Sequence, residues 1–229
     1  MKVTVNVAMT LDGKIDTVAR KGTKISSAED WERVDRLRAA HDAILVGGNT
    51  LLAEDPRLTV KSEALRADRI SRGLAPVPAK VGIVSQSALS ANSQFLTDGG
   101  GEVFVFTTER TSAGQIALLR DASAQVFVLG KTRVNLPAVF DVLAAHGIRS
   151  VLVEGGGRMI AALLAAGLVD EIHVYIAPLI FGGATAPTLV DGEGGLAGIK
   201  LALLDVCMLQ DGGVLTRYQV LRQFSFLAP

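Results

Sequence analysis

Two glycine-rich junctions are the stretches of this sequence that could hold a ligand. In "VLVEGGGRMIAALLAAG", residues 151–167, an apolar segment passes through three glycines into a helix-like stretch, and in "AILVGGNTLLAEDP", residues 43–56, it passes through two. Glycine costs little at a turn that needs a positive φ angle. Having no Cβ, it also lets a phosphate approach the N–H groups that open the next helix. Each junction is therefore either a structural turn or part of a phosphate site.

The glycines at 155–157 match neither of the common phosphate-binding motifs. A Walker A motif would continue with Gly-Lys-Ser/Thr, where Arg158 and Met159 stand, and a G-x-G-x-x-G motif would need glycine in place of Ile160. One such turn leaves both interpretations open. Two strand–glycine–helix junctions suit a ligand with two phosphates, because each helix start carries free N–H groups and the positive end of the helix dipole. We therefore expect a dinucleotide pyrophosphate between them, with two ordinary turns as the alternative.

A lysine and a glutamate follow apolar strands and could act on the ligand. Lys14, in "MTLDGKI", comes after the Asp-Gly turn that ends the first strand, and ligands of open α/β sheets gather at such carboxyl ends. Lys14 would meet an anionic substrate or polarise a reacting nitrogen; the alternative is a solvated lysine in a turn. Glu154 ends a buried strand, where a carboxylate is costly unless it is hydrogen-bonded. We therefore take Glu154 as a candidate site residue.

Two arginines have competing explanations. Arg57, in "EDPRLTV", is of the residue type that binds phosphate through two hydrogen bonds, but it could as easily pair with Glu54 or Asp55. Arg38 lies near the end of the first expected helix, where a cation also suits the negative end of the helix dipole. The residue pattern alone does not decide whether either arginine binds a ligand or only makes a local charge contact.

Several other chemistries find no support in the sequence. The three histidines, His41, His146 and His173, lie far apart and lack the spacing of metal ligands, so we expect no metal site. No G-x-S-x-G motif is present, and nothing pairs Cys207 with a base. The H-x-E and P-C-x-x-C signature of zinc deaminases is also absent. These observations favour an organic cofactor that brings its own reactivity.

The composition argues against some partners and compartments. The 229 residues carry 23 basic and 23 acidic side chains, and nucleic acid normally needs a basic surface. The longest apolar run, "MIAALLAAGLV", has 11 residues, whereas a membrane span needs about 20. The first strand alternates polar and apolar residues, unlike a signal peptide. Since the single cysteine cannot form an internal disulfide, we expect a soluble protein of the cytoplasm that binds neither nucleic acid nor membrane.

Short Val- and Ile-rich runs alternate with helix-like stretches, which predicts an α/β sandwich around a mostly parallel sheet. The expected strands are residues 2–9, 42–47, 80–85, 102–108, 124–130, 150–155, 171–178, 201–209 and 213–221, the last two forming an antiparallel hairpin. The expected helices are residues 26–40, with a capping box from Ser26 to Glu29, then 111–122 and 135–147. Residues 62–80 are expected to be a loop excursion within one domain of residues 1–229.

In combination, these motifs resemble a known enzyme family. "NVAMTLDGKI", "ISSAEDWERVDRLRAAHDAILVGGNTLLAEDPRLTV" and "VLVEGGGRMIAALLAAGLVDEIHVYIAPLIFGG", followed by "DGEG", are similar to the reductases of riboflavin biosynthesis over nearly the whole chain. The resemblance implies a dihydrofolate-reductase-like fold, a three-layer α/β sandwich, and a homodimer. It also implies NADPH as cofactor and a ribosylaminopyrimidine 5′-phosphate as substrate, whose ribosyl group becomes ribityl. Because the first strand begins at residue 2, the chain resembles the stand-alone reductases.

The same resemblance implies roles for particular residues. Beside the cofactor it puts Thr50, Glu54, Val84, Ser85 and Gln86, with Gly155, Gly156, Gly157, Arg158 and Met159 around the pyrophosphate. At the substrate it puts Lys14, Arg38, Leu58, Lys61 and Glu154, with Asn6 at the pyrimidine; from its residue type we add Arg57. Two positions depart from the family. Glu54 stands where Asp is usual, and Lys61 stands where some relatives have Arg, which exchanges a fork of donors for a point charge at the expected phosphate site.

The expected reaction is hydride transfer from the nicotinamide C4 of NADPH to C1′ of the ring-opened imine of the sugar. Lys14 and Glu154 would handle charge and proton near the imine, in an order that the sequence leaves open. It also leaves open whether the substrate is the 2,5-diamino pyrimidine or its deaminated form. Lys131 and Arg133 could meet the 2′-phosphate of NADPH. The alternatives are a dihydropterin or dihydrofolate-type reductase on the same fold, and a dinucleotide-binding protein without catalysis.

Overall fold

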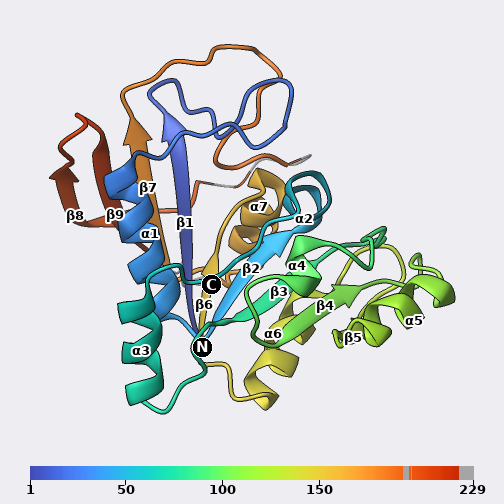
Figure 1. Ribbon diagram of the computed structural model, residues 1–229. Helices are drawn as coiled ribbons and strands as arrows, with labels where there is room; N and C mark the ends of the chain where they lie inside the picture. The colour runs from blue at the N-terminus through green and yellow to red at the C-terminus, as the bar shows by residue number, and fades with distance from the viewer. Residues whose placement is uncertain (193–195, 197, 222–229) are drawn as a thin grey trace, which may run out of the picture.

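One sheet runs through the structure, with helices on both of its faces (Figure 1). The computed structural model describes residues 1–192, 196 and 198–221. Within these residues the strand order is β5-β4-β3-β2-β6-β1-β7-β9-β8, with the seven strands from β5 to β7 parallel and the β8–β9 hairpin antiparallel. The strands are β1 (Lys2–Thr10), β2 (Ala43–Gly47), β3 (Ala79–Ile83), β4 (Val103–Thr107), β5 (Gln125–Val128), β6 (Ser150–Val153), β7 (Glu171–Ala177), β8 (Leu201–Met208) and β9 (Val214–Val220). The predicted fold class and all nine predicted strands are confirmed.

The central strands are buried along their whole length because both of their faces are covered. Every residue of β2, β3 and β4 is buried, as expected of parallel strands between two helical layers. Alternate residues of β2 serve the two layers: Leu45 packs in the core under the helices α6 (Leu136–Ala145) and α7 (Gly157–Ala165), and Ile44 packs in the core on the opposite face.

The remaining helices lie on that opposite face or at its edge. They are α1 (Ala28–Ala40), α2 (Gly48–Glu54), α3 (Glu63–Ser71), α4 (Gln94–Thr97) and α5 (Ala113–Asp121). Four helices begin at a side-chain cap, where a polar oxygen accepts a hydrogen bond from the third backbone N–H along; the caps are Ser27, Ser62, Ser112 and Asn135. Among the described residues, no helix is both long enough and apolar enough to cross a bilayer.

Two local predictions are wrong, and one motif cannot be followed to its end. The capping box from Ser26 to Glu29 is not formed, because the cap is Ser27, whose side chain accepts from the Asp30 N–H at 3.2 Å. Residues 62–80 are not a loop throughout: Ser62 caps α3, and β3 begins at residue 79. The second half of the "DGEG" motif, residues 193 and 194, lies outside the described residues.

The strand order puts a natural ligand position at the carboxyl ends of β2 and β6. From β2 the chain continues outward through β3, β4 and β5, whereas β6 returns to pair with the other side of β2. In open parallel sheets, ligands bind beyond the carboxyl ends of the strands where the connections change direction in this way. Both glycine-rich junctions follow these two strands.

The buried histidines make the stability of the fold sensitive to acid. Burial is the main cause that lowers the pKa of His173, and the nearby charges of Arg217 and Arg33 lower it further, while Glu171 acts in the opposite direction. Burial likewise lowers the pKa of His41. The folded protein therefore keeps both rings neutral at a pH where the unfolded chain, with an ordinary pKa of 6.5, binds protons.

We predict that the free energy of unfolding falls as the pH decreases below about 6.5, by up to about 1.4 kcal/mol per pH unit for each histidine that stays neutral. Urea titrations between pH 7.5 and 5 on the wild type and on His173→Gln measure this slope, which the substitution should reduce. His146→Gln, at an exposed ring, is the matched control. An unchanged slope in His173→Gln would contradict the prediction.

Candidate functional site

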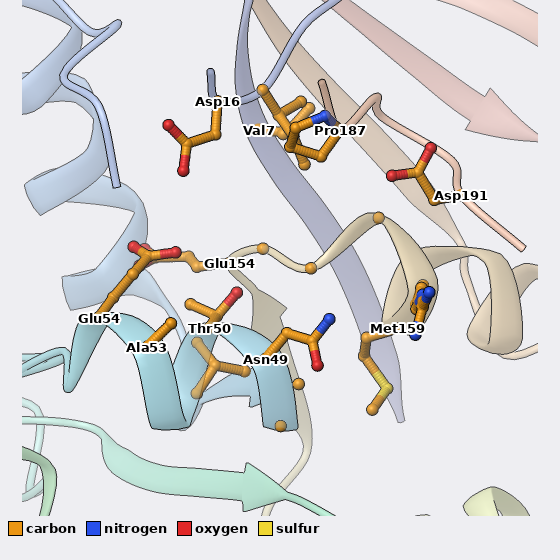
Figure 2. A pocket seen from close by; sticks show the side chains of 18 of the residues that line it. Val7, Asp16, Asn49, Thr50, Ala53, Glu54, Glu154, Met159, Pro187 and Asp191 are labelled. Carbon is orange, nitrogen blue, oxygen red and sulfur yellow. The ribbon is translucent and has the colours of Figure 1, made fainter. Parts of the chain in front are cut away.

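A cleft of about 1180 Å³ opens beyond the carboxyl ends of β1, β2, β3 and β6. Its walls come from the loop between β1 and α1, from α1 itself, from α2 and from the junction between β6 and α7. Figure 2 shows how side chains from these separate segments converge, among them Asp16, Thr50, Glu154 and Met159.

The two glycine-rich junctions lie side by side at the floor of this cleft. Gly156 is the N-cap residue of α7 and Gly47 that of α2, and neither helix receives a side-chain cap. A Cβ on Gly156 would lie 3.9 Å from the Gly47 Cα. The junctions are neighbours because β2 and β6 pair directly, with Leu45 opposite Val153.

Glycine is required at these positions by geometry. Gly155 and Gly156 have φ angles of +103° and +85°, which residues with a Cβ rarely adopt. A Cβ on Gly47 would approach the Met159 Cβ to 2.8 Å, closer than van der Waals contact allows. The same glycines thus allow both the positive φ angles of the turn before α7 and the close packing of the two junctions.

A buried ion pair closes one end of the cleft. The Arg38 guanidinium donates from Nε to Glu154 Oε1 at 2.9 Å and from Nη2 to Oε2 at 2.7 Å, a bidentate arrangement. Its Nη1 donates to the carbonyl oxygen of Thr59 at 3.0 Å. Both side chains are only 11% exposed. The pair ties α1 to the end of β6 across 116 residues of sequence.

Charge pairing outweighs burial at Arg38. Burial by itself would lower the pKa of Arg38, but the charge and the hydrogen bonds of Glu154, with a smaller effect of Asp35, raise it above its ordinary value. The guanidinium therefore stays charged and anchors Glu154, the carboxylate that the sequence places at a costly position.

The loop between β1 and α1 covers the cleft and is organised by Asp16. The Asp16 carboxylate accepts from the backbone N–H groups of Thr17, Gly22 and Thr23 at 2.7–3.0 Å. These bonds outweigh burial and lower the pKa of Asp16. Glu54 on α2 lies opposite this loop (Figure 2), and a Cβ on Gly22 would approach its Oε2 to 3.1 Å.

The model of a known family matches almost the whole of this arrangement. The RibD C-terminal domain family aligns with residues 1–215, which contain every element that builds the cleft. The chain belongs to the RibD C-terminal domain family. It is 42% identical over 191 residues to the 2,5-diamino-6-ribosylamino-4(3H)-pyrimidinone 5′-phosphate reductase of Archaeoglobus fulgidus, covering 83% of this chain and 86% of that protein. The protein of the same name from Methanothermobacter thermautotrophicus is also 42% identical, over 84% of both chains.

Solved structures share the fold of this RibD C-terminal domain. A pyrimidine reductase-like protein from Corynebacterium diphtheriae superposes with a TM-score of 0.83 at 21% identity, over 96% of this chain and 92% of that chain. RibD of Acinetobacter baumannii superposes with a TM-score of 0.77 at 23% identity, over 96% of this chain and 58% of that chain. The predicted dihydrofolate-reductase-like fold is therefore confirmed.

Most residues that the sequence predicts for the site line the cleft of this RibD C-terminal domain. They come from β1, α1, α2 and the segments after β3 and β6. They are Asn6, Arg38, Thr50, Glu54, Leu58, Val84, Ser85, Gln86, Glu154, Gly155, Gly156, Gly157, Arg158 and Met159. These residues are brought together although they span more than 150 positions of sequence.

Three predicted residues do not line the cleft. Arg57 is turned away: its Nε lies 2.9 Å from Asp98 Oδ2 and donates to Gln94 Oε1 at 2.8 Å, instead of pairing with Glu54 or Asp55. Lys14 follows a tight turn at Gly13 and forms an isolated bridge with Thr188. Its backbone stays bonded to Thr10 at the end of β1, with the Lys14 carbonyl accepting from the Thr10 N–H at 2.9 Å, but Lys14 is not among the residues that line the cleft.

Lys61 lies one side chain away from the cleft. Its Nζ is 5.2 Å from the centre of the Trp31 ring, a distance at which an ammonium group is attracted to the ring face. Trp31 itself lines the cleft and is the only tryptophan of the chain. Lys61 therefore belongs to the rim at the same end as Arg38.

Several lining residues were not predicted from the sequence. Asp16, Gly22 and Lys24 belong to the covering loop, while Trp31 and Asp191 come from α1 and from the segment after β7. None of these residues directly follows a buried strand or was assigned a role by the family resemblance, the two signals that marked most of the other candidates. An aspartate followed six residues later by a glycine, as Asp16 is by Gly22, is too common a pattern to predict that the loop between β1 and α1 lines the cleft.

We predict that Gly47→Ala destabilises the protein by about 1–3 kcal/mol, the usual cost of overpacking. The new methyl group would meet the Met159 Cβ, which is fixed to the backbone of α7 and cannot rotate away. Urea unfolding of Gly47→Ala and of Gly114→Ala tests this. Gly114 lies in α5, and a Cβ there would have nothing within 4 Å, so its substitution should be neutral or slightly stabilising. Equal stability of both variants would refute the close packing of the two junctions.

Proposed function

We propose that this chain is an NADPH-dependent reductase of riboflavin biosynthesis, which converts the ribosyl group of a ribosylaminopyrimidine 5′-phosphate into ribityl. The two archaeal relatives carry the reductase name and match this chain over most of their own length. Their names favour the 2,5-diamino pyrimidine over its deaminated form as the substrate. The observation that carries the proposal is that a single cleft joins the glycine junctions to the buried Arg38–Glu154 pair.

The residues of the cleft fit a nicotinamide dinucleotide. Gly157 and Arg158, the first residues of α7, line the cleft and the helix has no side-chain cap, so its first N–H groups are available to a phosphate. The Thr50 hydroxyl lies 3.4 Å and 3.5 Å from the positions that a Cβ would take on Gly155 and Gly156, so any side chain there would fill the cradle. Thr50 and residues 155–158 would hold the pyrophosphate, and the bound cofactor would supply a hydride.

The reacting sugar belongs at the other end, beside Glu154. Each Glu154 oxygen accepts one hydrogen bond from Arg38 and keeps a further lone pair for a hydroxyl or N–H group of the substrate. Asn6, with its side-chain oxygen buried and unpaired among the described residues, adds a second polar group for the pyrimidine. Lys61, at the rim, would attract the 5′-phosphate. The position of Lys14 gives no support to its expected role near the imine.

In this mechanism Glu154 orients the ring-opened imine and Arg38 keeps Glu154 in place. The bound dinucleotide would supply a hydride to C1′, the C=N double bond would become a single bond, and the nitrogen would take up a proton from solvent. Of the carboxyl groups that line the cleft in the described part of the chain, Glu154 is the one that the Arg38 guanidinium holds in place, so we assign to it the passage of a proton from solvent to that nitrogen. Holding both ligands in one cleft would speed the reaction by proximity, which requires the nicotinamide C4 and C1′ of the sugar to lie about 3–3.5 Å apart.

We predict that Glu154→Gln and Arg38→Lys each lower kcat/KM for the 2,5-diamino substrate by about 100-fold or more, because both break the bidentate pair. NADPH affinity should change by less than about threefold. The measurement is NADPH oxidation with the 2,5-diamino substrate, with its deaminated form and with dihydrofolate.

Arg66→Lys on α3, where Arg66 lies 3.9 Å from Glu63 at the surface, is the control for exchanging an arginine. Turnover of dihydrofolate alone would replace the proposal by a dihydrofolate-type reductase. Binding of NADPH without oxidation on either pyrimidine would leave a dinucleotide-binding protein.

We also propose that the enzyme is a cytoplasmic homodimer that buries the apolar surface of β8. Strand β8 is one of the two edge strands of the sheet, and at the far left of Figure 1 no other helix or strand of the described residues covers it. Leu203, Leu204, Val206 and Met208 are 47–80% exposed. An apolar edge of this kind is a liability in a monomer and typical of a subunit interface. The exposed free thiol of Cys207 on the same strand suits a reducing compartment.

We predict that Val206→Glu with Met208→Glu shifts the protein from dimer to monomer in sedimentation or light-scattering measurements, since two charges at an apolar contact cost more than the contact gains. Ile70→Glu, which introduces a charge at a residue 58% exposed on α3, should leave the mass unchanged. A wild type that is monomeric at micromolar concentration would contradict the proposal.

A further inference from the structure

Helix α1 carries three side chains in one row along the cleft. Trp31, Asp35 and Arg38 are four and three residues apart, the spacing that places side chains on the same face of a helix. Arg38 holds Glu154, and Trp31 lines the cleft. Asp35, between them, is only 9% exposed, and the proposed mechanism gives it no role. Because a buried carboxylate is costly unless its oxygens are bonded, its partners show what it does.

Both oxygens of Asp35 bind the backbone that leads into α3. Oδ1 accepts from the Lys61 N–H and Oδ2 from the Ser62 N–H, each at 2.8 Å. Hydrogen bonds to an ionised carboxylate are stronger than those between neutral groups. Asp35 therefore ties α1 to the backbone of one particular lysine, at the residue before the cap of α3.

The residues just before Lys61 are fixed as well. One turn further along α1, Arg38 Nη1 donates to the carbonyl oxygen of Thr59 at 3.0 Å. The side chain of Val60 is fully buried, in a small apolar core that it shares with Leu65 of α3. The segment of residues 59–62 is thus held at each of its residues, and the row on α1 supplies three of the hydrogen bonds.

This segment brings the Lys61 side chain to the face of Trp31. The Lys61 Nζ lies 5.2 Å from the centre of the ring, within the range of attraction between a cation and an aromatic face. Within the described residues, no carboxylate forms an ion pair with Lys61. Lysine is a point charge on a flexible stem, so it marks one position only where its backbone and its ammonium group are both held. Asp35 and Trp31 meet these two requirements.

A ring-opened sugar is oriented best when it is held at both ends. Its chain of single bonds is flexible, and binding energy from a remote group can be used to orient the reacting centre. The seven residues from Trp31 to Arg38 correspond to about 10.5 Å along the helix axis. The row on α1 therefore connects the place proposed for C1′, beside Glu154, with an ammonium group at the rim.

We propose that Asp35 is a positioning residue for the substrate phosphate: it fixes the backbone of Lys61 while Trp31 holds the ammonium group, and the enzyme thereby favours substrates that carry a 5′-phosphate. The inference rests on the proposed function, in which Lys61 attracts that phosphate. Asp35 is not among the residues that line the cleft. Its substitution should therefore act only through Lys61, and only on a substrate that carries the phosphate.

The test compares the 2,5-diamino substrate with the same compound without its 5′-phosphate. The ratio of the two kcat/KM values is measured in the wild type, Lys61→Gln, Asp35→Asn and the double variant. It should fall about tenfold or more in Lys61→Gln, which loses a charge-assisted hydrogen bond. In Asp35→Asn one accepting oxygen becomes an NH2 group, and the ratio should fall about threefold or more. The double variant should match Lys61→Gln, since the two residues act as one unit.

A binding measurement keeps the test independent of turnover. Trp31 is the only tryptophan of the chain, and a phosphate that binds Lys61 changes the surroundings of its ring. The Kd obtained from its emission should rise about threefold or more in Asp35→Asn for the phosphorylated compound. For the dephosphorylated compound it should stay within about twofold. A residue that only stabilises the start of α3 would change both values alike.

Asp68→Asn is the matched control, since Asp68 is a helical aspartate whose side chain is 59% exposed and paired with Arg72; it should leave the ratio unchanged. If Asp35→Asn does not fold, Trp31→Leu, at a residue 41% exposed, takes its place and should lower the ratio about threefold.

Four results would overturn the assignment: equal losses for the two compounds, an unchanged ratio, additive losses in the double variant, or a wild type without preference for the phosphorylated compound. A wild type that reduces neither compound would instead refute the proposed function.

Discussion

The direct pairing of β2 with β6 is the constraint on which the rest of the structure depends. It brings the ends of the two strands close enough that a Cβ on Gly47 would lie 2.8 Å from the Met159 Cβ. Only a chain without side chains at Gly47, Gly155 and Gly156 can turn twice in so little space. The two turns form the floor of the cleft, and Gly157 and Arg158 at the uncapped start of α7 line it. Strand order, through this contact, determines where a ligand can approach.

The Arg38–Glu154 pair depends on the same arrangement. Glu154 directly follows β6, and its backbone N–H donates to the Leu45 carbonyl of β2. The backbone position of Glu154 therefore does not depend on the partner of its side chain. Arg38 reaches it from α1 and also binds the Thr59 carbonyl. A pair buried this deeply gains little for stability, since desolvation of the two charges offsets their attraction, but either residue alone would be a buried unpaired charge. The pair is therefore better explained by what it presents to the cleft than by what it adds to the fold.

The sequence was informative where local pattern decides the outcome, and less so where distant segments meet. All nine strands were predictable because continuous Val and Ile runs between helices have few other solutions. Glu154, directly after β6, could be recognised as a site candidate for the same reason, whereas Ser85 was assigned only from the family resemblance. Arg57 could not, because its partner Asp98 lies 41 positions away and competes with two nearer carboxylates. The first helix cap moved by one residue because Ser26 and Ser27 are equivalent by propensity, and only tertiary contacts decide between them.

The electrostatics of the cleft explain how the four carboxylates that line it in the described part of the chain can surround the proposed position of two phosphorylated ligands. Glu154 is paired with Arg38, Asp16 accepts three backbone N–H groups, and Asp191 accepts from the hydroxyl and the N–H of Thr188.

Glu54 differs, since within the described part of the chain it accepts no hydrogen bond, and burial, with the charge of Asp16 as the smaller cause, raises its pKa. A raised carboxyl pKa means that the ionised form is the less favoured one there, and an approaching phosphate would raise it further. Among the described residues, three of these acids are thus held by fixed donors, and Glu54 is the one whose ionised form the site favours least. With the carboxylates held in this way, the positive charges of Arg38 and Lys61 at one end of the cleft can influence how an anionic ligand lies in it.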